Sequence, residues 1–209
     1  MNETNSLPAL LTRRIDALLS SRERVLLAIE GGSASGKTTL ASALAAAYAC
    51  PVFHMDDFFL QPAQRTAERL AQPGGNVDRE RFLSEVLLPL RQGRPIRYRA
   101  YDCSVSAIGP AREMLPGRLN VVEGAYSLHP DLADYYDLRV FLAIDPELQR
   151  SRILRRNTPE MAQRFFDRWI PLEQAYFDAM KPQERCGFII SSDSISYING
   201  EIRYESASF

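Results

Sequence analysis

Residues 31–38 of the chain, Gly-Gly-Ser-Ala-Ser-Gly-Lys-Thr, match the pattern G-x-x-x-x-G-K-[ST]. An apolar run at 25–29 precedes the match, and an Ala/Leu-rich stretch at 37–49 follows it. This order predicts a buried parallel strand, a glycine-rich turn and a helix, so that backbone N–H groups and the positive helix end converge on one anion. The flanking strand and helix disfavour the alternative, a glycine-rich turn without a ligand. We therefore predict a phosphate-binding loop.

Each residue type in this loop has a chemical reason. We expect Lys37 to reach the β- and γ-phosphates of a bound nucleotide, and Thr38 to offer its hydroxyl to Mg²⁺. The expected nucleotide contacts are Gly31, Gly32, Ser33, Ala34, Ser35, Gly36, Lys37, Thr38 and Thr39. The chain has no [NT]-K-x-D sequence to read guanine, which disfavours a GTPase switch.

Composition excludes several classes of protein. The net charge of −1 provides no global field for nucleic acid or an anionic membrane. The three cysteines are scattered and lack C-x-x-C spacing, which favours reduced thiols in a cytosol over a disulfide framework or a zinc site. We find neither a signal peptide nor an apolar run long enough to span a membrane. We therefore expect a cytoplasmic protein that binds neither nucleic acid nor a membrane, with homo-oligomer formation left open.

Hydrophobic patterning predicts an α/β fold. Apolar runs that suit strands alternate with helical patterns, which predicts a parallel sheet of about five strands with helices on both faces. The expected strands are 25–29, 51–55, 119–122, 138–144 and 187–191, and the expected helices are 7–22, 37–49, 78–92, 146–157 and 160–180. We expect one domain over 1–209, with an N-terminal helical segment (1–23), a lid region (145–160) and a C-terminal hairpin (192–209). Residues 60–77 lack periodicity and predict a mobile loop over the site.

Two acidic residues follow predicted strands near the phosphate loop. Asp56 comes just after the strand at 51–55, where a carboxylate can accept the proton of an attacking hydroxyl beside the γ-phosphate. Asp57 is adjacent but points elsewhere on extended backbone, so we expect only one of the two to face the phosphates. Glu123 ends the strand at 119–122 and suits the Mg²⁺ environment. The alternatives are a helix-capping or turn aspartate and a strand-end glutamate in solvent.

An arginine-rich helix is the third signal. Arg152, Arg155 and Arg156 have spacings that place at least two of them on one helix face. Such a face, closed over the site as a lid, neutralises charge on a transferring phosphoryl group, because a guanidinium matches phosphate oxygens in a bidentate manner. A solvated basic helix face is the alternative. The position after a phosphate loop and two acids favours the lid.

Taken in order, these motifs resemble the uridine kinase and phosphoribulokinase family of P-loop kinases over roughly residues 24–180. The quoted elements are the phosphate loop, Met55-Asp-Asp-Phe-Phe59, Asn76-Val-Asp78, Tyr101-Asp102, Val122-Glu-Gly124 and the arginine helix. The stretch 165–176 also resembles the helix after the lid in nicotinamide riboside kinases. The resemblance implies an α/β P-loop kinase with a short Arg-bearing lid that uses ATP and Mg²⁺.

The resemblance also implies individual roles. Asp56 would be the general base on a 5′-hydroxyl, Lys37 and Thr38 would hold ATP and Mg²⁺, and Glu123 would complete the metal environment. Arg152 and Arg155 would come from the lid. Phe58, Asp78, Tyr101 and Asp102 would line the acceptor pocket.

One departure from the family pattern bears on the acceptor. Ser106 stands about where uridine kinases carry a pyrimidine-reading His, and a small hydroxyl lacks the reach of an imidazole. The predicted activity is transfer of a phosphoryl group to a primary hydroxyl, with a nucleoside or ribosyl compound favoured. A kinase of pantothenate or glycerate, and a regulatory or assembly ATPase with the same fold, are the alternatives.

Overall fold

The structure is a computed structural model that describes residues 7–192, 195–198 and 201–204. The helices are α1 (Ala9–Ser21), α2 (Lys37–Tyr48), α3 (Ala67–Leu70), α4 (Arg79–Phe82), α5 (Leu88–Gln92), α6 (Pro130–Ala133), α7 (Pro146–Arg156), α8 (Pro159–Arg164) and α9 (Ile170–Met180). Short 3-10 turns occupy Met55–Phe58, Pro62–Gln64 and Pro182–Arg185, and π-helical segments occupy Leu83–Leu87 and Phe165–Trp169. Within the described ranges, no helix is long and apolar enough to cross a membrane.

The central sheet has five parallel strands in the order β2-β5-β1-β6-β7. They are β1 (Val25–Gly31), β2 (Val52–His54), β5 (Leu119–Glu123), β6 (Leu138–Ala143) and β7 (Phe188–Ser191). Every residue of β1 is buried, as a central strand covered on both faces requires. The predicted α/β fold and its five strands are confirmed.

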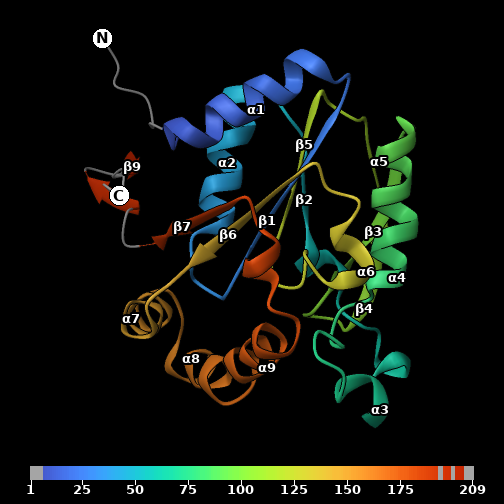
Figure 1. The fold of residues 1–209 in the computed structure, drawn as a ribbon. Coiled ribbons are helices and arrows are strands. Elements are labelled where there is room, and N and C mark those ends of the chain that lie inside the picture. The colour runs from blue at the N-terminus through green and yellow to red at the C-terminus, as the bar shows by residue number, and fades with distance from the viewer. Residues whose placement is uncertain (1–6, 193–194, 199–200, 205–209) are drawn as a thin grey trace.

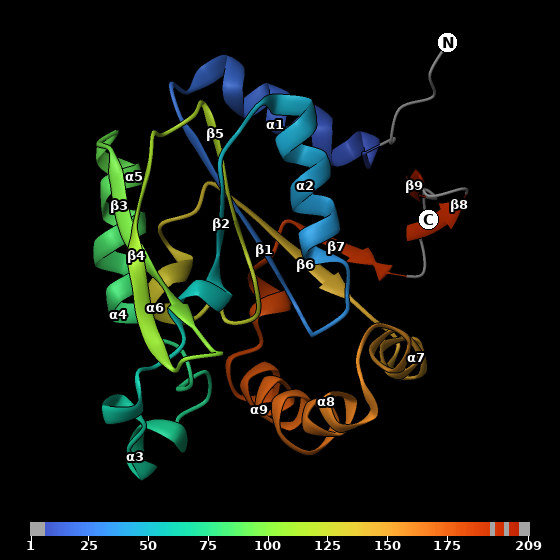
Figure 2. The same cartoon turned by 180° about the vertical axis from the view of Figure 1, so that it is seen from behind.

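The two faces of β1 pack into two separate cores. Leu27 and Ile29 belong to a cluster with Ile15 of α1 and Leu40 of α2. Leu26 lies in a second cluster, which includes residues of α4, α5 and α9. Successive strand side chains point to opposite faces, so one apolar run fills both layers. Figures 1 and 2 show the sheet between α1 and α2 on one side and α4 and α5 on the other, with α7, α8 and α9 grouped together.

A second, two-stranded sheet was not predicted. Strands β3 (Ile96–Asp102) and β4 (Ala107–Met114) pair antiparallel, with a register shift between Arg99 and Tyr101. In β3, Ile96, Tyr98 and Ala100 are buried while the arginines between them are exposed. The hairpin packs beside the turn at 55–58 that follows β2 (Figure 2). It therefore lies against the segment that carries Asp56.

The segment 60–77, predicted as a mobile loop over the site, contains short local structure. It contains a 3-10 turn at Pro62–Gln64 and the short helix α3. The Thr66 hydroxyl caps α3 by accepting from the Arg69 N–H. Arg69 ties the segment together by donating to the carbonyl oxygens of Gly75 and Val77, at 3.0 and 2.8 Å. Main-chain turns and side-chain caps thus hold this segment. Such contacts leave no apolar periodicity in the sequence, whereas a longer packed helix would.

Within the range 192–209, where the sequence predicted a hairpin, β8 (Ile195–Ile198) and β9 (Glu201–Tyr204) pair antiparallel. Residues 199–200 between these strands lie outside the described residues, as do 1–6 of the predicted N-terminal segment. The interpretation of 1–209 as one domain stays a prediction.

Candidate active site

The phosphate loop connects β1 to α2. Gly31 has a φ of +150°, and a Cβ there would lie 2.5 Å from the Leu142 carbonyl oxygen. Gly36 precedes α2 with a φ of +99°, in the left-handed region that favours glycine. The two glycines therefore allow the tight turn and the close approach of β1 to β6. The Lys37 ammonium donates to the Gly32 carbonyl oxygen at 2.8 Å, folded back over the loop.

The ends of β2 and β5 and the first turn of α2 bring His54, Glu123 and Thr38 together. His54 ends β2 and is in register with Glu123 at the end of β5. The buried Glu123 carboxylate accepts from the Thr38 hydroxyl at 3.2 Å, and the His54 Nδ1 lies 2.6 Å from the same oxygen. The hydrogen bond to Glu123 raises the pKa of His54. Sequence analysis missed His54, although its position at a neighbouring strand end is the signal that marks it.

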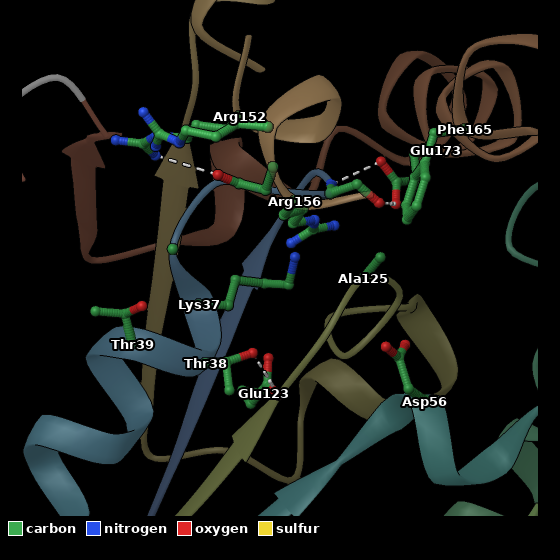
Figure 3. A pocket seen from close by; sticks show the side chains of 14 residues that line it. Lys37, Thr38, Thr39, Asp56, Glu123, Ala125, Arg152, Arg156, Phe165 and Glu173 are labelled. Carbon is green, nitrogen blue, oxygen red and sulfur yellow. Dashed lines mark hydrogen bonds between the residues drawn. The ribbon is translucent and has the colours of Figure 1, made fainter. Parts of the chain in front are cut away.

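Asp56 lines a cavity of about 380 Å³, together with Lys37, Thr38 and Glu123. Figure 3 shows its carboxylate opposite the phosphate-loop side chains. Surrounding protein atoms raise its pKa by burial, while the charge of Lys37 acts against that rise. Asp57 points away and accepts from the Tyr98 hydroxyl and from Arg112, at 3.1 and 2.9 Å. Only one of the two neighbouring carboxylates faces this cavity.

The arginine helix is α7, which begins at the N-cap Asp145. Arg152, Arg155 and Arg156 all line the cavity. The Arg152 guanidinium donates to the carbonyl oxygens of Ala34 and Ser192, both at 3.1 Å. Arg152 thus binds the loop backbone at Ala34. Within the described residues, neither Arg155 nor Arg156 donates a hydrogen bond to the loop backbone, although both line the cavity.

Glu173 is a cavity residue that the sequence did not reveal. It lies on α9, is only 6% exposed, and accepts from the Ser33 N–H and hydroxyl at 2.8 and 2.6 Å. Burial raises the pKa of its carboxyl group. A carboxylate within an otherwise ordinary amphipathic helix carries no local signal of such a contact.

Of the residues predicted to bind the acceptor, Asp56 lines that cavity, and the other four lie outside its lining. Phe58 packs in the core against Phe82, with ring centroids 5.0 Å apart. Asp78 caps α4 by accepting from Arg81 N–H at 3.1 Å, and the Tyr101 hydroxyl accepts from Arg65 at 2.8 Å.

Asp102 is exposed at the start of the β3–β4 turn, where it accepts from the N–H and hydroxyl of Ser104. These bonds lower its pKa. The structure thus places these four predicted acceptor contacts in core, cap and turn positions, and it does not bring them to Asp56 in one cavity.

A five-stranded parallel sheet whose central strand ends in a phosphate loop, with an arginine-bearing helix above it, defines the class of P-loop kinases. The model of the Phosphoribulokinase / Uridine kinase family matches residues 26–168, which is more than half of the chain. The chain belongs to this family of phosphotransferases.

Individual relatives are more distant. A "Uridine kinase" of Staphylococcus epidermidis is 28% identical over 150 residues, which cover 66% of this chain and 70% of that protein. "Uridine-cytidine kinase-like 1" of Mus musculus is also 28% identical over 150 residues, covering 67% of this chain and only 27% of the mouse protein.

Solved structures share the fold. A "Possible Uridine Kinase" from Bacillus stearothermophilus superposes with a TM-score of 0.61 at 23% identity, covering 86% of this chain and 98% of that one. D-glycerate 3-kinase from Cryptococcus neoformans superposes with a TM-score of 0.60 at 14% identity, covering 90% of this chain and 97% of the other. At such identities the likeness concerns the fold alone.

Proposed function

We propose that this protein is a cytoplasmic, Mg²⁺- and ATP-dependent kinase that transfers the γ-phosphoryl group to a primary hydroxyl of a small metabolite. One observation carries the proposal: Asp56 faces Lys37, Thr38 and Glu123 across the same cavity. A nucleotide-hydrolysing switch needs no carboxylate placed to receive the proton of an alcohol, whereas a kinase does.

The chain's own groups divide the work of phosphoryl transfer. The loop N–H groups and Lys37 hold the triphosphate, and Arg155 and Arg156 offset charge that develops on the transferring group. Asp56 takes the proton of the acceptor hydroxyl as that oxygen attacks in line. Because burial raises the pKa of Asp56, its carboxylate is a stronger base than an ordinary aspartate. Catalysis then comes mainly from positioning and charge neutralisation.

The residues around Thr38 fit a magnesium ion. Thr38 and Glu123 offer a hydroxyl and a carboxylate oxygen 3.2 Å apart, and Mg²⁺ prefers such oxygen donors. Within the described residues, no group of three or more His, Cys, Asp or Glu side chains is arranged as a complete metal site. Bound Mg²⁺, held partly by nucleotide oxygens, would neutralise phosphate charge. His54 would keep the Glu123 carboxylate oriented.

The favoured acceptor is a nucleoside or ribosyl compound, in keeping with the names of the Staphylococcus epidermidis and Mus musculus relatives. A non-nucleoside acceptor such as glycerate or pantothenate is the second candidate, and a specific observation supports it. Ser106, which stands about where uridine kinases carry a pyrimidine-reading His, is exposed with a φ of +53° in the β3–β4 turn. Its short side chain offers no replacement for an imidazole that reads a base.

The proposal is tested with Asp56→Asn and Asp57→Asn as a matched pair of neighbouring variants. Removal of a general base slows turnover by roughly 10²- to 10⁴-fold, so Asp56→Asn should lose that much activity while its ATP affinity stays within a few fold. Asp57→Asn should lose far less, because Asp57 faces Tyr98 and Arg112. Full turnover in Asp56→Asn would remove this residue from the mechanism.

A further inference from the structure

Helices from the lid side hold the backbone of the phosphate loop. The Ser33 N–H and hydroxyl both donate to Glu173 of α9, bonds that Figure 3 draws as dashed lines. The Ser33 carbonyl oxygen accepts from Gln149 of α7 at 2.8 Å, and Arg152 of α7 donates to the next carbonyl oxygen, that of Ala34. Elements more than a hundred residues away therefore fix the first half of the loop.

Hydrogen bonds from Ser33 offset the cost of burying the Glu173 carboxylate. A carboxylate that is 6% exposed costs free energy unless donors compensate it. Its two short bonds both go to Ser33, and Lys37 supplies favourable charge from farther away. Charge-assisted hydrogen bonds of this kind are about twice as strong as neutral ones. The contact therefore fixes the position of Ser33 within the loop.

The same helix also reaches the start of the loop. The hydroxyl of Tyr176, one turn after Glu173, donates to Glu30 at 3.1 Å, and Glu30 accepts from the Gly31 N–H at 2.9 Å. Residues at two points of the loop are thus connected to one helix, α9. A loop fixed in this way pays less ordering entropy when a triphosphate binds.

We propose that Glu173 is a positioning residue for the nucleotide, which holds the phosphate loop in its binding shape through Ser33. This inference rests on the proposed function, in which the loop binds ATP. It makes α9, a helix beyond the lid, a determinant of nucleotide affinity. The opposing effect is Coulomb repulsion between the carboxylate and the triphosphate, which would make removal of Glu173 strengthen ATP binding. Removal of Glu173 should therefore weaken ATP binding if the positioning role dominates and strengthen it if repulsion dominates.

The test compares Glu173→Ala with Glu173→Gln by titration with Mg-ATP in the absence of acceptor. Loss of both bonds in Glu173→Ala should weaken ATP binding about tenfold, near the low end of the cost of hydrogen bonds to charged groups. Glu173→Gln should restore most of the affinity, because its carbonyl oxygen can accept from the Ser33 N–H while its amide donates to the hydroxyl. Gln174→Ala, at the adjacent exposed position, is the matched control and should bind as the unmodified protein does.

Hydrogen exchange in the nucleotide-free protein provides a readout that does not depend on activity. The Ser33 amide should exchange faster in Glu173→Ala and stay protected in Glu173→Gln. Ser33→Ala loses only the 2.6 Å bond, should bind ATP about threefold more weakly, and tests the contact if Glu173→Ala does not fold.

In the double variant Glu173→Ala/Ser33→Ala, the loss of ATP affinity should be smaller than the sum of the two single losses, since both substitutions remove the same contact. Additive losses, unchanged Ser33 exchange, or tighter ATP binding in Glu173→Ala would each overturn the proposal. These outcomes are read from binding alone, so they remain distinct from the failure of any acceptor to be phosphorylated.

Discussion

Glu30, the last buried acid before the phosphate loop, makes the stability of this protein depend on pH in a direction that can be worked out. Its side chain is fully buried. One carboxylate oxygen accepts from Gly31 and Tyr126 N–H, and the other from Leu128 N–H and the Tyr176 hydroxyl, at 2.9 to 3.1 Å. Burial outweighs these donors and raises the pKa of Glu30 from 4.5 to about 7.

Proton linkage gives the direction in which the free energy of unfolding changes with pH. The folded state holds the Glu30 proton more tightly than the unfolded chain does, so the contribution of this group to stability is fully present below pH 4.5 and is lost as the pH rises through about 7. One pKa unit corresponds to about 1.4 kcal/mol, so the rise in pKa is worth roughly 3 kcal/mol. Most of that, about 2.5 kcal/mol, falls between pH 5 and pH 8.

The assay is urea unfolding of the unmodified protein and Glu30→Gln at pH 5 and pH 8. Asp56 and Glu173 titrate in the same direction, but they are common to both proteins and cancel in the difference. Between the two pH values, the free energy of unfolding of the unmodified protein should fall by about 2.5 kcal/mol more than that of Glu30→Gln. Equal changes in the two proteins would refute the assignment of a raised pKa to this carboxylate.

Three further results are expected. Lys37→Ala should weaken ATP binding and abolish phosphoryl transfer together, and normal ADP release in that variant would contradict the role of the loop. The acid limb of kcat/KM should lie above pH 3.8, the ordinary pKa of an aspartate. The reason is that burial raises the pKa of Asp56 and the general base must be ionised. A limb at or below pH 3.8 would argue against Asp56 as the base. Gly31→Ala should lower stability by about 2 kcal/mol or more, seen as a reduced Tm, since its Cβ would meet the Leu142 carbonyl oxygen. An unchanged Tm would show that the loop can shift freely.

The sheet and the phosphate loop were predictable because their signals are local. The run at 25–29 is apolar throughout, as a strand buried on both faces requires. The β3–β4 hairpin was missed although β3 carries a strand signal, since exposed arginines alternate with its buried residues. Its partner β4 is mostly exposed and contains Gly109 and Pro110, so it shows no such alternation. The burial of β3 depends on packing beside the turn after β2, which no local pattern records.

The candidate site divides in the same way. Lys37, Thr38, Asp56 and Glu123 follow from strand ends and motif spacing, and the structure brings them to one cavity. Glu173 contacts Ser33 across 140 residues of chain, so only the tertiary fold reveals it. Asp78 and Asp102 accept hydrogen bonds as a helix cap and a turn residue, and their place in an acceptor pocket stays a prediction.

The most direct test of the proposed kinase is ADP release from Mg-ATP across a panel of acceptors. The panel holds uridine, cytidine, other nucleosides, nicotinamide riboside, pantothenate, glycerate and ribulose 5-phosphate. We expect one acceptor to stimulate ADP release strongly, and we expect Asp56→Asn to abolish that stimulation. Tight ATP binding with no stimulation by any acceptor would contradict the proposal and favour a regulatory ATPase.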